Sequence, residues 1–476
     1  MSNEIHGSPE TSGDLKRSLS NRHLQLIAIG GAIGTGLFLG SGQTISLTGP
    51  SLLITYLIIG IVLFAFMRAL GELLLSNTRF NSFVDIANEY LGPFGGFVIG
   101  WTYWLSWIVS SMSDLTAMGQ YFSFWFPNVP HWLTVLFIVL LLISFNMLGA
   151  KLFGELEFWF SIIKIITIIA MIIVGLVMIF FSFKTSYGHA SFSNLVNHGG
   201  IFPNGPAGFL MSFQIAVYSF IGIELIGVTA GETKDPRTVI PKAINNVPVR
   251  ILLFYVGGLL VIMSVIPWNK INPDASPFVM LFSMIGLPFA AGLVNFVVLT
   301  AAASATNSGI YSNSRILFGL SKQGLGPKML SKTNHHSVPY LSMFVSSGTL
   351  LLAALLNFIF PDAIQLFIYV TTLSTVLFIV VWAMIIISYI IYVRKNPEEH
   401  KHNKFKLLGG KALAYVILAF FLFVFVLLFF SADTRVAIFI SPVWFIFLFL
   451  FYKKYKKNAE YLAEKTRQQP RESINH

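Results

Sequence analysis

The sequence predicts an all-α integral membrane protein with twelve transmembrane helices, in which two inverted repeats of five helices form the core. Of its 476 residues, 55% are hydrophobic and only 11% are charged. Apolar segments of about 20 residues, the length that spans a bilayer as a helix, recur along the chain. The first and the sixth segment are interrupted by glycine and polar residues, which predicts that helices 1 and 6 are discontinuous. Because each repeat has an odd number of helices, the second must be inverted relative to the first.

The apolar segments set the expected limits of the helices and domains. The helices are expected at 24–45, 51–73, 95–124, 131–149, 157–181, 208–230, 248–267, 278–305, 338–359, 363–393, 411–431 and 435–452. A disordered polar tail, the inverted-repeat core, two peripheral helices and a second polar tail are expected at 1–22, 23–393 (23–181 and 208–393), 411–452 and 453–476. The first apolar segment is too long for a signal-peptide core and many more follow it, so we expect it to be retained.

Four glycines lie within seven residues of the first segment, at Gly30, Gly31, Gly34 and Gly36. Each costs about 1 kcal/mol relative to alanine in a helix interior, so the backbone is expected to open there. Open backbone inside a membrane has to be buried in protein or line a polar cavity, where its N–H groups favour an anion. The alternative is that Gly30 and Gly34 simply let two helices pack closely.

The second interruption lies in the sixth segment, where Ser219, Gly222 and Glu224 stand among apolar residues. Carbonyl groups freed at this break would accept hydrogen bonds from an ammonium group, while N–H groups at the first break would bind a carboxylate. Two such breaks fit the backbone of an α-amino acid and are typical of secondary transporters. Phe220, next to the break, is a candidate aromatic lid. The residues expected to contact the substrate are Ile33, Gly34, Thr35, Gly36, Ala216, Ser219, Phe220, Gly222 and Ile223.

Lys164 is the clearest ionisable residue inside an apolar segment. Such residues cost several kcal/mol in a membrane, so each is a functional candidate. Lys164 lies in the fifth segment, about 10 Å along the helix from the expected membrane edge. We interpret it as a buried amine that binds and releases a proton as the site changes access. The alternative is a structural anchor whose ammonium extends to the interface.

Glu224 and Asp114 are two further ionisable residues within apolar segments. Glu224 is interpreted as a proton carrier or a contact to the substrate, and the alternative is a partner for backbone freed at the break. Asp114, in the outer half of the third segment, is a candidate gating or selectivity residue. A solvated charge in a vestibule is the alternative for Asp114.

The sequence lacks the motifs of several enzyme classes. It has no cysteine, which excludes disulfides and thiol catalysis. The hydrophilic segments contain no Walker loop, no HExxH motif and no paired catalytic carboxylates. We therefore expect no enzyme activity, no cofactor and no metal site. The loops are also too short for an ATPase domain, so transport would use an ion gradient or be facilitated diffusion.

The formal net charge of +11 is better explained by membrane orientation than by nucleic-acid binding. If the N-terminus is cytoplasmic, only three basic residues, Lys184, Lys270 and Arg435, fall outside, and Lys164 falls within a segment. The positive-inside rule then predicts that both termini lie in the cytoplasm and that the protein sits in the plasma membrane. The expected partners are the lipid bilayer, an amino acid and a proton, with no nucleic acid. The sequence does not set the oligomeric state.

Four motifs carry a resemblance to a known family. They are NRHLQLIAIGGAIGTGLF from Asn21, GELEFWFSIIK from Gly154, GIE from Gly222 with ETKDP from Glu232, and ASATNSG from Ala303 leading to Ser314-Arg315. With these motifs the chain resembles the amino acid transporter branch of the amino acid–polyamine–organocation superfamily. The similarity runs from about residue 19 to residue 451.

The resemblance implies a five-plus-five inverted-repeat fold and import of small neutral amino acids, such as glycine, alanine and serine with their D-forms, by proton symport. It also implies that Lys164 takes the place of a sodium ion found in related folds, with its ammonium near Ser304. Gating or selectivity is expected at Asp114, Ser304 and Thr371. Relatives that carry aromatic or basic amino acids share these motifs, so transport of another amino acid class is an alternative. A membrane sensor with a transporter-like body is a second alternative.

Overall fold

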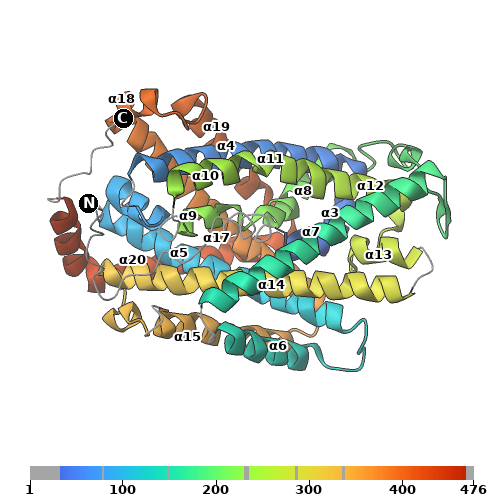
Figure 1. The fold of residues 1–476 in the computed structure, drawn as a ribbon, viewed down its shortest axis with the longest axis horizontal. Helices are drawn as coiled ribbons and strands as arrows, with labels where there is room; N and C mark the ends of the chain where they lie inside the picture. The colour runs from blue at the N-terminus through green and yellow to red at the C-terminus, as the bar shows by residue number, and fades with distance from the viewer. Residues whose placement is uncertain are drawn as a thin grey trace, which may run out of the picture.

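The computed structural model describes residues 33–77, 80–146, 150–229, 235–284, 288–334 and 338–467. The expected tail at 1–22 lies outside these residues, as do Gly30 and Gly31 in the first part of helix 1. The described part of the chain is a bundle of long helices that run side by side (Figure 1). It also contains a short antiparallel hairpin of β1 (Lys184–Thr185) and β2 (Gly188–His189).

The α-helices up to the second break are α2 (Thr35–Phe38), α3 (Gly40–Thr48), α4 (Leu52–Ser76), α5 (Phe83–Phe122), α6 (His131–Asn146), α7 (Ala150–Phe180) and α8 (Gly205–Ala216). They are followed by α9 (Ile226–Thr229), α10 (Pro236–Asn245), α11 (Val247–Arg250), α12 (Gly258–Val265), α13 (Pro277–Met284) and α14 (Pro288–Lys322). The last are α15 (Tyr340–Thr349), α16 (Leu351–Ile359), α17 (Ala363–Lys395), α18 (Pro397–His402), α19 (Gly410–Leu427) and α20 (Ala432–Arg467). Short turns complete the set: η1 (Gly49–Ser51), η2 (Phe192–Leu195), η3 (Tyr218–Phe220), η4 (Ile223–Leu225), the π-helical η6 (Ile251–Gly257), η7 (Trp268–Lys270) and η8 (Lys328–Ser331).

The predicted all-α membrane fold is confirmed. Among the described residues, nine helical stretches are long and apolar enough to cross a membrane, and α6 is a shorter apolar helix. The described helices follow the order of the twelve expected segments, with α2 and α3 forming the second part of helix 1.

The predicted discontinuity of helix 6 is present, and the described part of helix 1 begins at the other predicted break. Gly34 is extended, with φ −127° and ψ −160°, and α2 begins directly after it. In the sixth segment α8 ends at Ala216, the turn η3 follows, and Ile221 is extended with ψ 139°. Gly222 then adopts φ 101°, a left-handed conformation that side chains other than hydrogen strongly disfavour. Glycine is therefore required at the second break for its backbone shape.

The eighth helix differs from its expected limits of 278–305. The structure has a short α13 and then a long α14 that begins at Pro288 and ends at Lys322. Proline suits the first turn of a helix, where its missing N–H is not needed. The second half of α14 is polar yet buried in the bundle, with Ser308, Ser312 and Asn313 each at most 2% exposed. The C-terminal limit predicted from hydropathy alone therefore lies too early in the sequence.

The third and the last helix need a closer look at their limits. Helix α5 consists of two helices joined at Gly92, whose φ of 81° and ψ of 176° are not helical. The first begins at Phe83, where Ser82 and Asp85 form a capping box, and the second follows Gly92, close to the expected start at 95. The last continues from its apolar part to Arg467, past the expected end at 452. Its second part is rich in Lys, Glu and Ala, which favour helix without being apolar.

The two breaks meet in the middle of the bundle. Helix α5 packs along both α14 and α17, while α7 packs on α14 from another side. The first helical turn after Gly34, α2, contacts both η3 and α14. The last two helices, α19 and α20, pack against α17. This arrangement places both interrupted segments beside α5 and α14 in the centre of the bundle.

Candidate functional site

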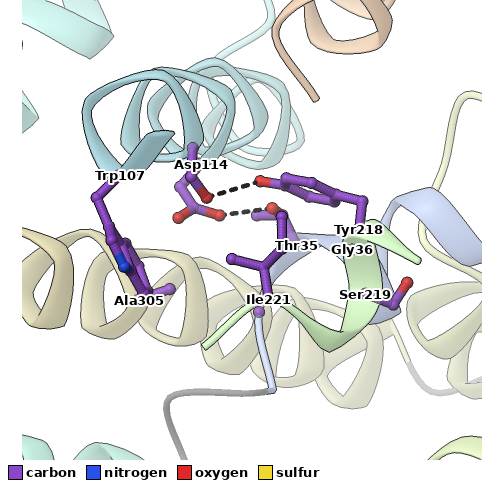
Figure 2. A pocket seen from close by; sticks show the side chains of 10 residues that line it. Thr35, Gly36, Trp107, Asp114, Tyr218, Ser219, Ile221 and Ala305 are labelled. Atoms are coloured by element: carbon purple, nitrogen blue, oxygen red, sulfur yellow. Dashed lines mark hydrogen bonds between the residues drawn. The ribbon is translucent and has the colours of Figure 1, made fainter. Parts of the chain in front are cut away.

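A small pocket lies where the two breaks meet. Figure 2 shows Trp107 and Ala305 on one side of it, with Tyr218 and Ser219 on the other. Its lining comes from the first break, α5, the second break and α14: Gly34, Thr35, Gly36, Trp107, Ser110, Asp114, Tyr218, Ser219, Ile221 and Ala305. The pocket therefore combines backbone from both interrupted helices with side chains from the two central ones.

Asp114 lies against the first break. The hydroxyl of Thr35 donates to Asp114 Oδ1 at 2.5 Å, as the dashed line in Figure 2 shows. Asp114 is only 3% exposed, so it is not a solvated vestibule charge in this conformation. Its carboxylate is thus part of the pocket wall, beside the backbone that was expected to bind a substrate carboxylate.

Two tyrosines hold the second break in place. The hydroxyl of Tyr218 is 2.5 Å from Ser113 Oγ and 3.4 Å from Ser110 Oγ on α5. Tyr255 donates its hydroxyl proton to the carbonyl of Ser219 at 2.8 Å. The Ser219 carbonyl keeps one further lone pair for another donor. These contacts fix the backbone that faces the pocket.

The two breaks approach each other so closely that only glycine fits at position 36. A Cβ atom on Gly36 would lie 2.6 Å from Ser219 Cα and 2.9 Å from a ring carbon of Tyr218. These distances are shorter than real Cβ contacts, and the nearest atom belongs to backbone. Gly36 thus allows direct contact between the two halves of the site.

Lys164 is fully buried next to the pocket and does not extend to an interface. Its Nζ donates to Ser304 Oγ at 2.9 Å and to the carbonyl of Ile33 at 3.4 Å. Ser304 Oγ in turn lies 2.8 Å from each carboxylate oxygen of Glu157. Glu157, Lys164 and Ser304 each have an exposed fraction of 0%. The expected proximity of Lys164 to Ser304 is therefore found, together with an acidic partner.

Several residues expected to contact the substrate do not line the pocket. The backbone of Ala216, Gly222 and Ile223 belongs to the second break without entering the lining. Phe220, expected as a lid, instead stacks on Tyr255 at 4.8 Å between ring centroids. From the second break, the aromatic side chain that lines the pocket is that of Tyr218, two residues before Phe220, because residues two apart in a 3₁₀ turn point in different directions.

Glu224 and Thr371 also lie outside the pocket lining. The carboxylate of Glu224 accepts from the N–H of Gly222 at 3.1 Å and from the hydroxyl of Tyr103 at 3.3 Å. It therefore satisfies backbone freed at the break, which was the alternative for this residue. Thr371 bonds to the carbonyls of Phe367 and Ile368 in its own helix.

The structure adds residues that were not among those expected to contact the substrate. Trp107 and Ser110 precede Asp114 by seven and four residues on α5, so the helical repeat places them on the same face as Asp114. Applying that periodicity around Asp114 would have found both. Glu157 had no comparable signal, because it stood at the expected membrane edge. The other additions to the pocket are Tyr218, Ile221 and Ala305.

A membrane-spanning bundle in which interrupted segments meet at a polar pocket is an architecture typical of transporters. The comparisons with known proteins give the particular family. The model of the amino acid permease family matches residues 23–461, and the chain belongs to that family. It is thus a multi-pass membrane transporter rather than an enzyme.

Three relatives match over nearly the whole chain. The uncharacterized transporter YdgF of Bacillus subtilis is 53% identical over 439 residues, which cover 92% of this chain and 95% of the relative. The amino-acid permease AapA of the same organism is 51% identical over 439 residues, with the same coverage. The D-serine/D-alanine/glycine transporter of Escherichia coli is 50% identical over 435 residues, covering 91% and 93%.

Proposed function

We propose that the protein imports small neutral amino acids, namely glycine, alanine and serine with their D-forms, by proton symport and alternating access. It would do so in the plasma membrane, with both termini in the cytoplasm. The observation that carries the proposal is the pocket itself, in which backbone from both breaks is enclosed by Trp107, Ile221 and Ala305. The printed name of the Escherichia coli relative supports the same substrate class.

The proposed binding mode uses the two breaks for the two charged groups of the amino acid. The substrate carboxylate would face the backbone N–H groups around Gly34 and Gly36, and the ammonium would face Ser219. The substrate side chain would then point toward Trp107 and Ala305. Packing against these two residues would favour a small side chain such as a hydrogen, a methyl or a hydroxymethyl group.

Asp114 would act as the gate of this site. Its carboxylate already accepts a hydrogen bond from Thr35, next to the proposed carboxylate position. Two ionised carboxylates at such short range repel each other, so Asp114 has to bind a proton or turn away when the substrate enters. Asp114 would therefore link substrate entry to protonation, while Lys164 carries the coupling proton.

One observation favours a second candidate function. The carboxylate of Asp114 lines the pocket and would attract the cationic side chain of a basic amino acid. Transport of lysine or arginine is therefore the alternative within the same family.

The test is counterflow in proteoliposomes preloaded with one unlabelled amino acid at a time. External D-[³H]alanine should enter against internal glycine, D-alanine, D-serine or L-serine, and it should not exchange with internal lysine or phenylalanine. No entry of D-[³H]alanine, together with exchange of external [³H]lysine against internal lysine, would replace the proposal by the basic-substrate alternative. Empty liposomes and the variant Gly36→Ala are the controls, because the substitution fills the contact between the two breaks.

A further inference from the structure

Glu157 forms a buried cluster with Ser304 and Lys164 beside the substrate pocket. Ser304 Oγ lies 2.9 Å from Lys164 Nζ and 2.8 Å from each carboxylate oxygen of Glu157. The Ser304 hydroxyl can accept from the ammonium and donate to the carboxylate at the same time. The three side chains therefore form one continuous chain of hydrogen bonds.

The cluster contains two ionisable side chains and is fully enclosed by protein. Glu157 and Lys164 come from α7 and Ser304 comes from α14, and each is 0% exposed. Two charged groups act on Lys164: Glu157 from its own helix and Asp114 from α5. Lys164 in turn is the charged group that acts on Glu157. The net charge of a buried amine and a buried acid is zero whether the shared proton lies on the amine or on the acid, so neither arrangement leaves an uncompensated buried charge.

The cluster extends from the first break toward the start of α7. Lys164 contacts the carbonyl of Ile33 at the first break, whereas Glu157 lies seven residues earlier on α7, about 10 Å nearer to the start of that helix. Under the proposed orientation, that end of α7 faces the cytoplasm. The line from the break through Lys164 and Ser304 to Glu157 therefore leads from the pocket toward the cytoplasmic side.

We propose that Glu157 is the proton-exchange partner of Lys164 and that the Ser304 hydroxyl relays the proton between them. This inference rests on the proposed proton symport. In the step, a proton leaves Lys164 Nζ for Ser304 Oγ while the original hydroxyl proton of Ser304 passes to Glu157. One N–H bond and one O–H bond break, and two O–H bonds form. Lysine ends neutral, glutamic acid ends protonated and serine ends unchanged.

The relay separates proton release from substrate exchange. Counterflow of substrate needs the pocket and the gate but no net proton movement. Net accumulation driven by a proton gradient needs Lys164 to lose its proton to the cytoplasm in every cycle. Removing the relay should therefore impair accumulation and leave counterflow intact.

The experiment compares Glu157→Gln and Ser304→Ala with wild type in proteoliposomes. Gradient-driven accumulation of D-alanine is expected to fall by about tenfold or more in both variants, while counterflow stays within about twofold of wild type. The drop should be in Vmax rather than KM, and the dependence of uptake on internal pH should flatten. Glu157→Asp and Ser304→Thr, which keep the exchanging groups, should restore accumulation at least in part.

Thr300→Val is the matched control. Thr300 lies one helical turn before Ser304 on α14, is 8% exposed, and donates to the carbonyl of Val297 in its own helix. Its loss removes a buried hydroxyl without touching Glu157 or Lys164, so accumulation should be unchanged.

Two results would overturn the relay. Wild-type accumulation and pH dependence in Glu157→Gln would show that Glu157 exchanges no proton. An equal loss of counterflow and accumulation in Ser304→Ala, without rescue by Ser304→Thr, would assign the cluster a purely structural role. If wild-type protein itself shows counterflow but no gradient-driven accumulation, the proposed symport fails instead, and the variants separate the two failures.

Discussion

The Nζ atom of Lys164 lies 3.4 Å from the carbonyl oxygen of Ile33, the residue directly before the extended Gly34 at the first break. This hydrogen bond to backbone connects the proposed proton site with the proposed substrate site. An ammonium donates more strongly to a carbonyl than a neutral amine does. In the proposed symport, the protonation state of Lys164 would therefore change the strength of its contact with the break.

Lys164→Ala removes this connection. We expect gradient-driven accumulation of D-alanine to fall by about tenfold or more, while counterflow persists, because the pocket lining does not include Lys164. Parallel measurements of accumulation and counterflow in proteoliposomes test this. Lys184→Ala, at an exposed lysine of the β1 strand, is the control. Uphill accumulation equal to wild type in Lys164→Ala would show that the lysine does not couple the proton.

Gly36→Ala should separate the two breaks. The added Cβ would meet Ser219 Cα at 2.6 Å, and overpacking of this kind costs about 1–3 kcal/mol. We expect kcat/KM for D-alanine uptake to fall by about tenfold or more. Gly348→Ala on α15 is the matched control, because a Cβ there meets no atom within 4 Å. Similar uptake by both variants would contradict the close approach of the breaks.

Ala305→Leu should narrow the side-chain end of the pocket. Glycine, which has no side chain, should be affected least, so the ratio of glycine to serine uptake should rise. Discrimination by one methylene group in an apolar pocket is about 10-fold to 200-fold, which sets the expected size of the change. Trp107→Ala should have the opposite effect and admit leucine. Unchanged ratios in both variants would place the substrate side chain elsewhere.

Glu72 is a further buried acidic residue, and its contacts give it a structural role. Glu72 on α4 is 0% exposed and accepts from Tyr389 at 2.9 Å, from His400 Nδ1 at 2.5 Å and from the backbone N–H of Leu407 at 2.8 Å. These bonds hold α18 and the segment after it against α4 and α17.

His400→Ala removes one of the three bonds to Glu72. The loss of a partner for a buried carboxylate costs about 1–3 kcal/mol, so the midpoint of thermal unfolding in detergent should fall. His402→Ala is the control, because the ring of His402 is exposed and contacts only the carbonyl of Glu398 in the same short helix. An equal midpoint for the two variants would show that the contact to Glu72 contributes no stability.

The breaks themselves were predictable from sequence, because glycine weakens a helix and polar residues are costly in the middle of an apolar segment. Gly34, Thr35, Gly36 and Ser219 all line the pocket as expected. The polarity of the residues was enough to locate the backbone of the site. Which side chain of the second break faces the pocket was not predictable, because it depends on the extended conformation of Ile221.

Glu157, the acidic partner of Lys164, could not be predicted from the sequence for a related reason. Glu157 stood at the expected start of the fifth helix, where a carboxylate is normally solvated. The helix in fact begins at Ala150, so Glu157 lies about two turns inside it and faces Ser304 of α14. Contacts between helices far apart in sequence decide such a pairing, and hydropathy along one helix carries no information about them.

The central claim is that substrate and proton move together through the pocket at the two breaks. The most direct test is the internal pH of proteoliposomes that contain a trapped pH indicator, measured after external D-alanine is added without any imposed proton gradient. A membrane-potential clamp with potassium and valinomycin removes electrical effects. We expect internal acidification with wild-type protein and none with Lys164→Ala. Entry of labelled D-alanine without acidification in the wild-type protein would contradict the claim.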